Sequence, residues 1–151
     1  MENKKAPEFN INNQHGTIVN LDQYNGKKIV IYFYPKDMTP GCSVEAQGFQ
    51  DLYQEFQDAH TEIIAVSKDS ETSHQKFCDA FGLTFNLLAD TETTMAQDYN
   101  VWKEKSMFGK KYMGISRESF LVDETGIIIK HWDNVKPATH PTDVLNYIKN
   151  L

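Results

Sequence analysis

Two kinds of apolar pattern along this chain predict where its strands and helices lie. Continuous apolar runs, rich in β-branched and aromatic residues, occur at Lys28–Tyr34 and Glu62–Ser67. Such runs are typical of central strands that are buried on both faces of a sheet. Three shorter strands are expected at Phe85–Leu88, Glu118–Val122 and Ile127–Trp132. The last two flank Asp123-Glu-Thr-Gly126, a sequence that predicts a hairpin turn.

A separate β-hairpin is expected ahead of these strands. Phe9–Ile11 and Thr17–Leu21 flank the turn-rich segment Asn12-Asn-Gln-His-Gly16. The residues before the hairpin, to about Pro7, are expected to form a loose terminus.

A helix is predicted after each of the two long apolar strands. After Pro40, apolar residues recur at i, i+3, i+4 and i+7 from Phe49 to Phe56, which places them on one face of a helix. A second helix is expected to begin at Ser70, whose hydroxyl can cap it, and to run to about Phe81. Glycine at the next position is a common helix C-cap.

The C-terminal half contains two more predicted helices and one long irregular segment. Thr91 is expected to cap a brief helix that ends near Tyr99, and a final helix is expected from about Pro141 to Asn150. Between them, Val101–Gly114 mixes aromatic residues, methionines, lysines and glycines. We expect a long loop over a pocket there, with its aromatic residues packed on the core rather than forming a rim for organic substrates.

These elements predict an α/β fold with a mixed central sheet flanked by helices. The core order β-α-β followed by β-β-α is that of the thioredoxin fold, extended here by the N-terminal β-hairpin. A length of 151 residues suits one domain spanning 1–151.

Composition and charge argue against several classes of protein. The net charge is −6 and no basic block occurs, which argues against nucleic acid or anionic membrane as a partner. The longest apolar run, Ile29–Tyr34, is far shorter than the ~18 residues of a membrane span. The N-terminus has no apolar signal-peptide core, so a cytoplasmic location is expected.

The strongest chemical signal is a cysteine at the start of a helix. The segment Tyr34-Pro-Lys-Asp-Met-Thr-Pro-Gly-Cys42 joins a buried strand to a helix and places Cys42 in the first helical turn. Free backbone N–H groups and the positive end of the helix dipole stabilise a thiolate, the reactive form of cysteine. The alternative is a structural cysteine that only fills space in the core.

The segment resembles the active site of the peroxiredoxins. Pro35, Thr39 and Cys42 fit the family signature P-x-x-x-[ST]-x-x-C. The stretches Phe33–Cys42, Gly109–Gly114 and Arg117–Asp123 are similar to the bacterioferritin co-migratory protein, or peroxiredoxin Q, subfamily. The similarity runs from the N-terminal hairpin to the last helix.

The resemblance implies a role for each residue of the motif. Cys42 is the expected peroxidatic thiolate, which attacks a peroxide oxygen and becomes a sulfenic acid. Thr39 is expected to align the peroxide, and Pro35 to shield the sulfur from water. Arg117 is expected to hold the thiolate and the peroxide oxygens with its fork of donors, and Glu45 to tether Arg117 from the helix.

Two of these roles have simpler alternatives. Arg117 is the only arginine among 15 basic residues, which favours the functional role, but it could instead form a surface salt bridge to Glu118. Glu45 could be a favourable acidic residue in the first turn of its helix.

The chain departs from the subfamily at the position that often carries a second cysteine. Five residues after Cys42 stands Gln47, so a short-range disulfide cannot form. The only other cysteine is Cys78, on the following predicted helix. Some members of the subfamily resolve the sulfenic acid from this helix, and the alternative is that Cys78 only packs in the core. We expect two separate thiols in the reduced protein, and local unwinding of a helix before they bond.

The resemblance implies a thiol peroxidase that reduces hydrogen peroxide and small organic hydroperoxides. It implies no cofactor, a monomer, and recycling by a partner dithiol such as thioredoxin. A one-cysteine peroxidase and a non-enzymatic redox sensor with a thioredoxin fold remain the alternatives. The histidines have no metal-ligand spacing and are expected to be surface or packed residues: His15, His60, His74, His131 and His140.

Overall fold

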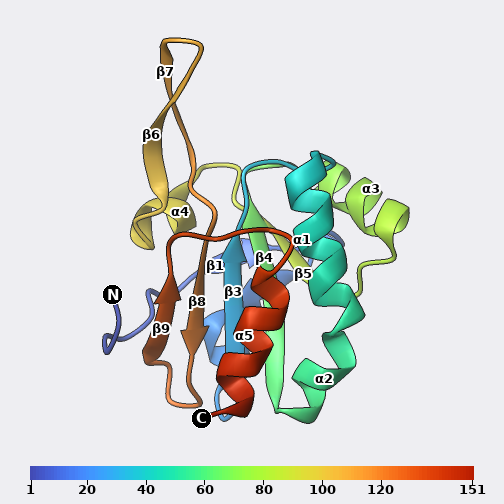
Figure 1. Ribbon diagram of the computed structural model, residues 1–151, viewed down its shortest axis with the longest axis vertical. Helices are drawn as coiled ribbons and strands as arrows, with labels where there is room; N and C mark the ends of the chain where they lie inside the picture. The colour runs from blue at the N-terminus through green and yellow to red at the C-terminus, as the bar shows by residue number, and fades with distance from the viewer.

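A five-stranded mixed sheet forms the centre of the computed structural model, which describes residues 1–151 (Figure 1). The strand order is β5-β4-β3-β8-β9. The central strand β3 runs parallel to β4 and antiparallel to β8, so the sheet is mixed as predicted. The strands are β3 (Lys28–Phe33), β4 (Thr61–Ser67), β5 (Asn86–Ala89), β8 (Glu118–Val122) and β9 (Ile128–Trp132).

Helices cover one face of the sheet, and a smaller layer covers the other (Figure 1). The first layer holds α1 (Pro40–Asp51), α2 (Tyr53–Asp58), α3 (Glu71–Phe81) and α5 (His140–Lys149). The second holds α4 (Thr94–Asp98) and the predicted N-terminal hairpin of β1 (Asn10–Asn12) and β2 (Ile18–Asn20), followed by the 3-10 turn η1 (Leu21–Tyr24).

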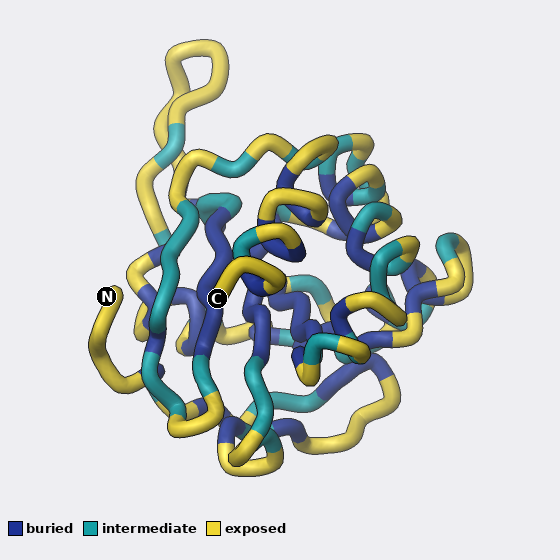
Figure 2. The backbone as a smooth tube through the Cα atoms, turned by 60° about the horizontal axis from the view of Figure 1, so that its bottom comes forward, coloured by how far each residue is buried: buried dark blue, intermediate teal, exposed yellow.

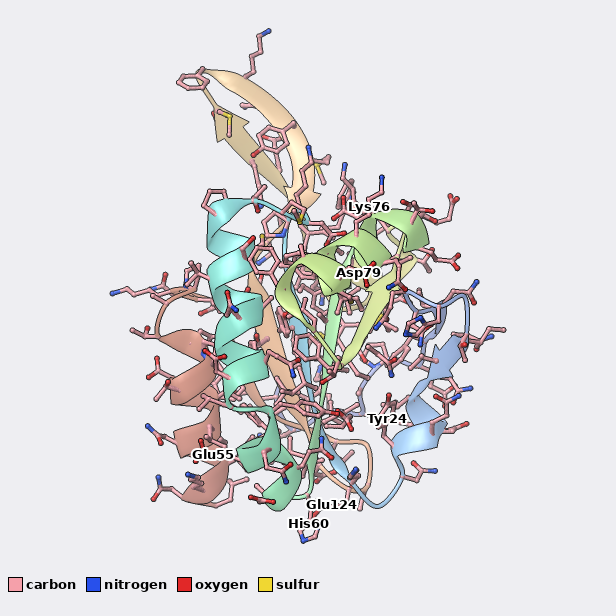
Figure 3. The ribbon with its side chains drawn as sticks, turned by 90° about the vertical axis from the view of Figure 1, so that its right-hand side faces the viewer. Tyr24, Glu55, His60, Lys76, Asp79 and Glu124 are labelled. Atoms are coloured by element: carbon pink, nitrogen blue, oxygen red, sulfur yellow. The ribbon has the colours of Figure 1, made fainter.

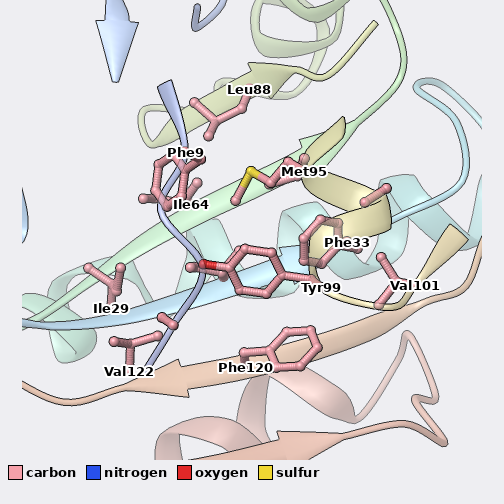
Figure 4. Packing of buried hydrophobic residues seen from close by; sticks show 14 of the residues in the cluster. Phe9, Ile29, Phe33, Ile64, Leu88, Met95, Tyr99, Val101, Phe120 and Val122 are labelled. Carbon is pink, nitrogen blue, oxygen red and sulfur yellow. The ribbon is translucent and has the colours of Figure 1, made fainter. Parts of the chain in front are cut away.

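The alternation of side chains along β3 divides the core into two clusters. Ile29, Ile31 and Phe33 point to the α4 side, whereas Val30 and Tyr32 point to the α1 side. Figure 4 shows the first cluster, in which residues from the N-terminal segment, the sheet and α4 meet. Because both faces of β3 are fully buried, its position in the sheet is fixed by the apolar run that predicted it.

The boundaries of α3 agree with the sequence prediction. The hydroxyl of Ser70 accepts a hydrogen bond from the Ser73 N–H at 3.1 Å, and Gly82 follows the last turn with a positive φ of 65°. Both are ordinary helix-capping devices.

The predicted apolar face from Phe49 to Phe56 belongs to two helices rather than one. The helical stretch is interrupted at Leu52, where φ is −99° and ψ is 5°. The interruption leaves both Phe49 and Phe56 fully buried, with their rings 5.8 Å apart.

The expected cap of α4 is wrong. Thr91 does not cap the helix, because it begins three residues later, at Thr94. The carboxylate of Asp90 supplies the capping acceptors instead, at 3.1 Å from the Met95 N–H and 2.8 Å from the Ala96 N–H.

The expected loop at Val101–Gly114 is also wrong, since most of it forms a β-hairpin of β6 (Trp102–Met107) and β7 (Lys110–Ile115). The hairpin projects from the body of the molecule (Figures 1 and 2). Of its aromatic residues, Trp102 packs against the core as expected, whereas Tyr112 is 44% exposed and Phe108 at the tip is 98% exposed. Both residues of the two-residue turn, Phe108 and Gly109, have positive φ, as a type I′ turn requires.

No helix in the structure combines the length and the apolar character needed to cross a bilayer.

Candidate functional site

The first turn of α1 follows the carboxyl end of β3 and presents Cys42. Thr39 is the N-cap and Pro40 the first helical residue. The first backbone hydrogen bond of the helix runs from the N–H of Ser43 to the carbonyl of Thr39, so the N–H groups of Gly41 and Cys42 have no backbone acceptor. Free N–H groups at a helix N-terminus favour an anion, here a thiolate.

Arg117 reaches the sulfur of Cys42 from the start of the neighbouring strand β8. It immediately precedes β8, and its Nη2 donates to the Cys42 Sγ at 3.3 Å. A Cβ on Gly41 would lie 3.2 Å from that same Nη2, so glycine allows the guanidinium to approach. Cys42 itself is 1% exposed. The structure therefore brings the predicted cysteine and arginine into direct contact.

Glu45 holds the other arm of the guanidinium. Its Oε1 accepts from Arg117 Nη1 at 2.7 Å, and its Oε2 is buried without a partner. Burial raises the pKa of Glu45 to about 7, although Arg117 partly opposes the rise. Burial alone would lower the pKa of Arg117, but the charges of Glu45 and Cys42 hold it above its ordinary value.

Thr39 and Pro35 lie in the loop that approaches Cys42. The Thr39 hydroxyl donates to the carbonyl of Lys36 at 2.8 Å and makes no hydrogen bond to the sulfur. Pro35 is half-buried, and Met38 has a φ of 66°, which is rare for a residue other than glycine. Backbone strain of this kind is concentrated at functional loops.

Cys78 is a second free thiol, in the second half of α3. It is 6% exposed and lies beside a surface hollow of about 550 Å³. Burial, followed by the charges of Asp37 and Asp79, raises the pKa of Cys78 to about 11. Neither cysteine is in a disulfide, and each stands on its own helix, as expected for the reduced protein.

A buried polar cluster joins α3 to the loop between β3 and α1, which leads to Cys42 and is called the Cys42 loop below. The sequence did not reveal this cluster. Asp37 accepts hydrogen bonds from Tyr34, Ser73 and His74 at 2.5, 2.8 and 2.7 Å. His74 is therefore more than a packed histidine. The only trace in the sequence was its place on the inner stripe of the predicted helix, because its acidic partner lies 37 residues away.

Asp37, Asp69 and His74 have ligand atoms within 4.8 Å of one another, a spacing that would suit a metal ion. The side-chain oxygen and nitrogen atoms that would bind a metal already make hydrogen bonds to protein groups. Asp69 accepts from the backbone N–H of Asp37 at 2.9 Å and from the Ser67 hydroxyl at 2.7 Å. The group is held together by its own hydrogen bonds.

Apolar side chains are exposed close to Cys42 in the sequence and along the projecting hairpin. Met38 is 55% exposed and Val44 is 50% exposed, and both lie within a few residues of Cys42. The hairpin adds Met107, Phe108, Tyr112 and Met113.

Known proteins resemble this chain along almost all of its length. A model of the AhpC/TSA family matches residues 3–131. Peroxiredoxin Bcp of Bacillus subtilis is 46% identical over 148 residues, which cover 98% of this chain and 94% of the relative. Peroxiredoxin Bcp of Escherichia coli is 40% identical over 144 residues, covering 95% and 92%.

Solved structures agree with this fold. Peroxiredoxin Q of Xanthomonas campestris superposes with a TM-score of 0.90 at 39% identity, covering 94% of this chain and 90% of that one. A mutant of PrxQ from Xylella fastidiosa gives a TM-score of 0.91 at 33% identity, covering 99% and 98%.

Proposed function

The chain belongs to the AhpC/TSA family and is a peroxiredoxin, a thiol-dependent peroxidase, and we propose that Cys42 is the residue that attacks its peroxide substrate. The observation that carries this proposal is the contact between Arg117 Nη2 and the Cys42 sulfur at the N-terminus of α1. A permanent cation and a helix N-terminus act on the same sulfur, and both favour its thiolate.

The proposed first step is a displacement on oxygen. The thiolate of Cys42 donates an electron pair to the terminal peroxide oxygen, an S–O bond forms, and the O–O bond breaks. The sulfur becomes a sulfenic acid, and the remaining oxygen leaves as water or an alcohol once it gains a proton. The guanidinium of Arg117 and the free N–H groups of α1 face the negative charge throughout this step.

The neighbouring residues position these groups. Glu45 fixes one arm of the guanidinium from within the same helix, and Gly41 leaves room for the other arm. We propose that Pro35 limits water at the sulfur. Thr39 would turn its hydroxyl from the Lys36 carbonyl to the bound peroxide, because a hydroxyl rotates freely between acceptors.

We propose that Cys78 resolves the sulfenic acid. Its sulfur attacks the Cys42 sulfur, a disulfide forms, and the hydroxyl leaves as water. Two solved forms of the Xanthomonas campestris protein are cysteine-to-serine mutants whose mutated cysteines are 36 residues apart. Cys42 and Cys78 have the same separation.

The remaining features of the cycle follow from this chemistry. A disulfide needs a dithiol to reduce it, for which thioredoxin in the reducing cytoplasm is suited. One chain carries both cysteines and Arg117, so a monomer has the whole site. The substrates would be hydrogen peroxide and small organic hydroperoxides, since alkyl peroxide reduction is described for the bacterioferritin comigratory protein of Xanthomonas campestris, which is 38% identical with a TM-score of 0.90.

A one-cysteine cycle is the second candidate, and the burial of Cys78 favours it. With its pKa raised to about 11, the Cys78 thiol stays protonated at neutral pH in the folded protein. In that cycle an external thiol would reduce Cys42, and Cys78 would only pack in the core.

Two variants test the proposal in a peroxidase assay coupled to thioredoxin, the first the role of Cys42 and the second the choice between the two cycles. Cys42→Ser should abolish turnover, because a serine hydroxyl is not ionised at neutral pH. Cys78→Ser should still consume one equivalent of peroxide per chain and then stop as the sulfenic acid. Turnover by Cys42→Ser would refute the assignment of Cys42, and normal cycling by Cys78→Ser would leave the one-cysteine cycle.

A further inference from the structure

The buried cluster around Asp37 connects the two segments that carry the cysteines. Asp37 lies in the loop that leads into α1, and His74 lies in the first turn of α3. Asp37 is 5% exposed and His74 is fully buried. Cys78 follows His74 by four residues, so the two share one side of α3. Lys76 and Asp79 mark the outer side of that helix (Figure 3).

Both ring nitrogens of His74 have hydrogen-bond partners. Its Nε2 lies 2.9 Å from the carbonyl oxygen of Leu88, and a carbonyl only accepts, so Nε2 carries a proton. Its Nδ1 lies 2.7 Å from Asp37 Oδ2, which also accepts from the Ser73 hydroxyl. The Tyr34 hydroxyl donates to the other oxygen of Asp37, so both oxygens of this buried side chain have partners. Asp37 and His74 thus form a buried hydrogen-bonded pair.

The movement that brings the two cysteines together has to break this pair. Both thiols are buried and unbonded, on different helices. A disulfide requires the two sulfurs to be in bonding contact and the two Cα atoms to lie within ~7 Å, so at least one of the two free thiols must move from its buried position. Releasing either the Cys42 loop from α3 or the first turn of α3 from that loop separates Asp37 from His74. A buried polar group that loses its hydrogen-bond partner is costly, so the pair opposes the release.

We infer that Asp37 and His74 are positioning residues that set how fast the Cys42 sulfenic acid is converted to the disulfide. This inference rests on the proposed resolving role of Cys78. While the pair is intact, Cys42 stays beside Arg117 at the N-terminus of α1, where it reacts with peroxide. When it opens, the two sulfurs can meet. The pair therefore decides between resolution and further oxidation of Cys42 by a second peroxide molecule, which yields a sulfinic acid.

The electrostatics of Cys78 agree with this role. After burial, the charge of Asp37 is the largest cause of the raised pKa of the Cys78 thiol, and Asp79 adds to it. Opening the pair moves Asp37 away from α3 and exposes Cys78 to water. Both changes favour the thiolate, the form that attacks sulfur. The same movement would thus release Cys78 and activate it.

The test compares Asp37→Asn and His74→Gln with the wild type by rapid quenching, alkylation and mass spectrometry. Asparagine keeps the shape of Asp37 and a hydrogen bond to His74 but removes the charge, so this variant should fold. We expect disulfide formation to become about tenfold faster in each variant, the factor of one charged hydrogen bond. The peroxide concentration that half-converts Cys42 to the sulfinic acid should rise by a similar factor, whereas the first reaction of Cys42 with peroxide should stay within about twofold of the wild type.

Val122→Ala is the control, because it removes core volume in the cluster on the other face of the sheet. It should lower global stability without changing the rate of disulfide formation. The inference is overturned if Asp37→Asn resolves at the wild-type rate, or if Val122→Ala accelerates resolution equally. Should His74→Gln not fold, Asp37→Asn decides alone. A wild-type protein that forms no Cys42–Cys78 disulfide would overturn the resolving role itself, and with it this inference.

Discussion

A single guanidinium connects Cys42 with Glu45. Arg117 donates one arm to the Cys42 sulfur and the other to Glu45. Its planar fork spans both partners at once, which the single ammonium of a lysine cannot do. At this position the planar fork of donors therefore matters in addition to the positive charge.

Arg117→Lys tests the geometry of the fork separately from its charge. We expect peroxide turnover to fall by about 100-fold or more, because an oriented donor to developing charge is lost. Initial rates with hydrogen peroxide and a dithiol provide the measurement. Lys149→Arg, an exchange at a half-exposed lysine paired with Glu55, is the matched control and should leave the rate unchanged. A near-normal rate in Arg117→Lys would show that the fork is not required.

Local sequence predicted the residues of the site that lie close together in the chain. The helix that begins at Pro40 places Cys42 in its first turn, and the resemblance to peroxiredoxins pointed to Arg117, which does contact the sulfur. The buried partnership of Asp37 with His74 was not predictable in this way. It depends on how far the β3–α1 loop extends over α3, which is set by tertiary packing.

Among the elements, the β6–β7 hairpin shows most clearly where sequence patterns fail. Strands are recognised by the alternation that one buried face imposes. Here most positions of both strands are exposed, so the alternation is absent and the segment resembled a loop (Figure 2). The central strands, buried on both sides, were predicted to within a residue.

The tip of this hairpin offers a stabilising substitution. Phe108 occupies the first turn position with a φ of 52°, where asparagine is strongly preferred ahead of glycine. Phe108→Asn should therefore raise the protection of the hairpin amides against hydrogen exchange, by about 1 kcal/mol. Because the Phe108 side chain is almost fully exposed, hydrogen peroxide turnover should not change. Weaker protection, or a loss of turnover, would contradict this account of the hairpin.

For the whole molecule, the buried acid at the site links stability to pH. The pKa of Glu45 is about 7 in the folded protein, against an ordinary value of 4.5. Between these values the folded state holds a proton that the unfolded chain has lost. The free energy of unfolding therefore falls as pH rises from 4.5 to 7. His140 acts in the opposite direction, since burial and then Arg117 lower its pKa to about 4, and it favours folding less as pH falls below 6.5.

Glu45→Gln isolates the first effect, because glutamine does not titrate. Urea unfolding of both proteins between pH 4.5 and 7.5 gives the difference in unfolding free energy. The wild type should lose about 3 kcal/mol relative to the variant over this range, from a shift of two to three pKa units. The contribution of His140 is present in both proteins and cancels in the difference. Parallel pH profiles would show that Glu45 is already ionised at pH 4.5.

The central claim is that peroxide oxidises Cys42 and that Cys78 then bonds to it. The most direct measurement is peptide mapping by mass spectrometry, without reduction, of the wild-type protein after one equivalent of hydrogen peroxide. The account predicts the loss of two free thiols per chain and a cross-linked peptide that joins Cys42 to Cys78 within one molecule. A free Cys42 after the peroxide is consumed, or an oxidised Cys42 beside a free Cys78, would contradict it.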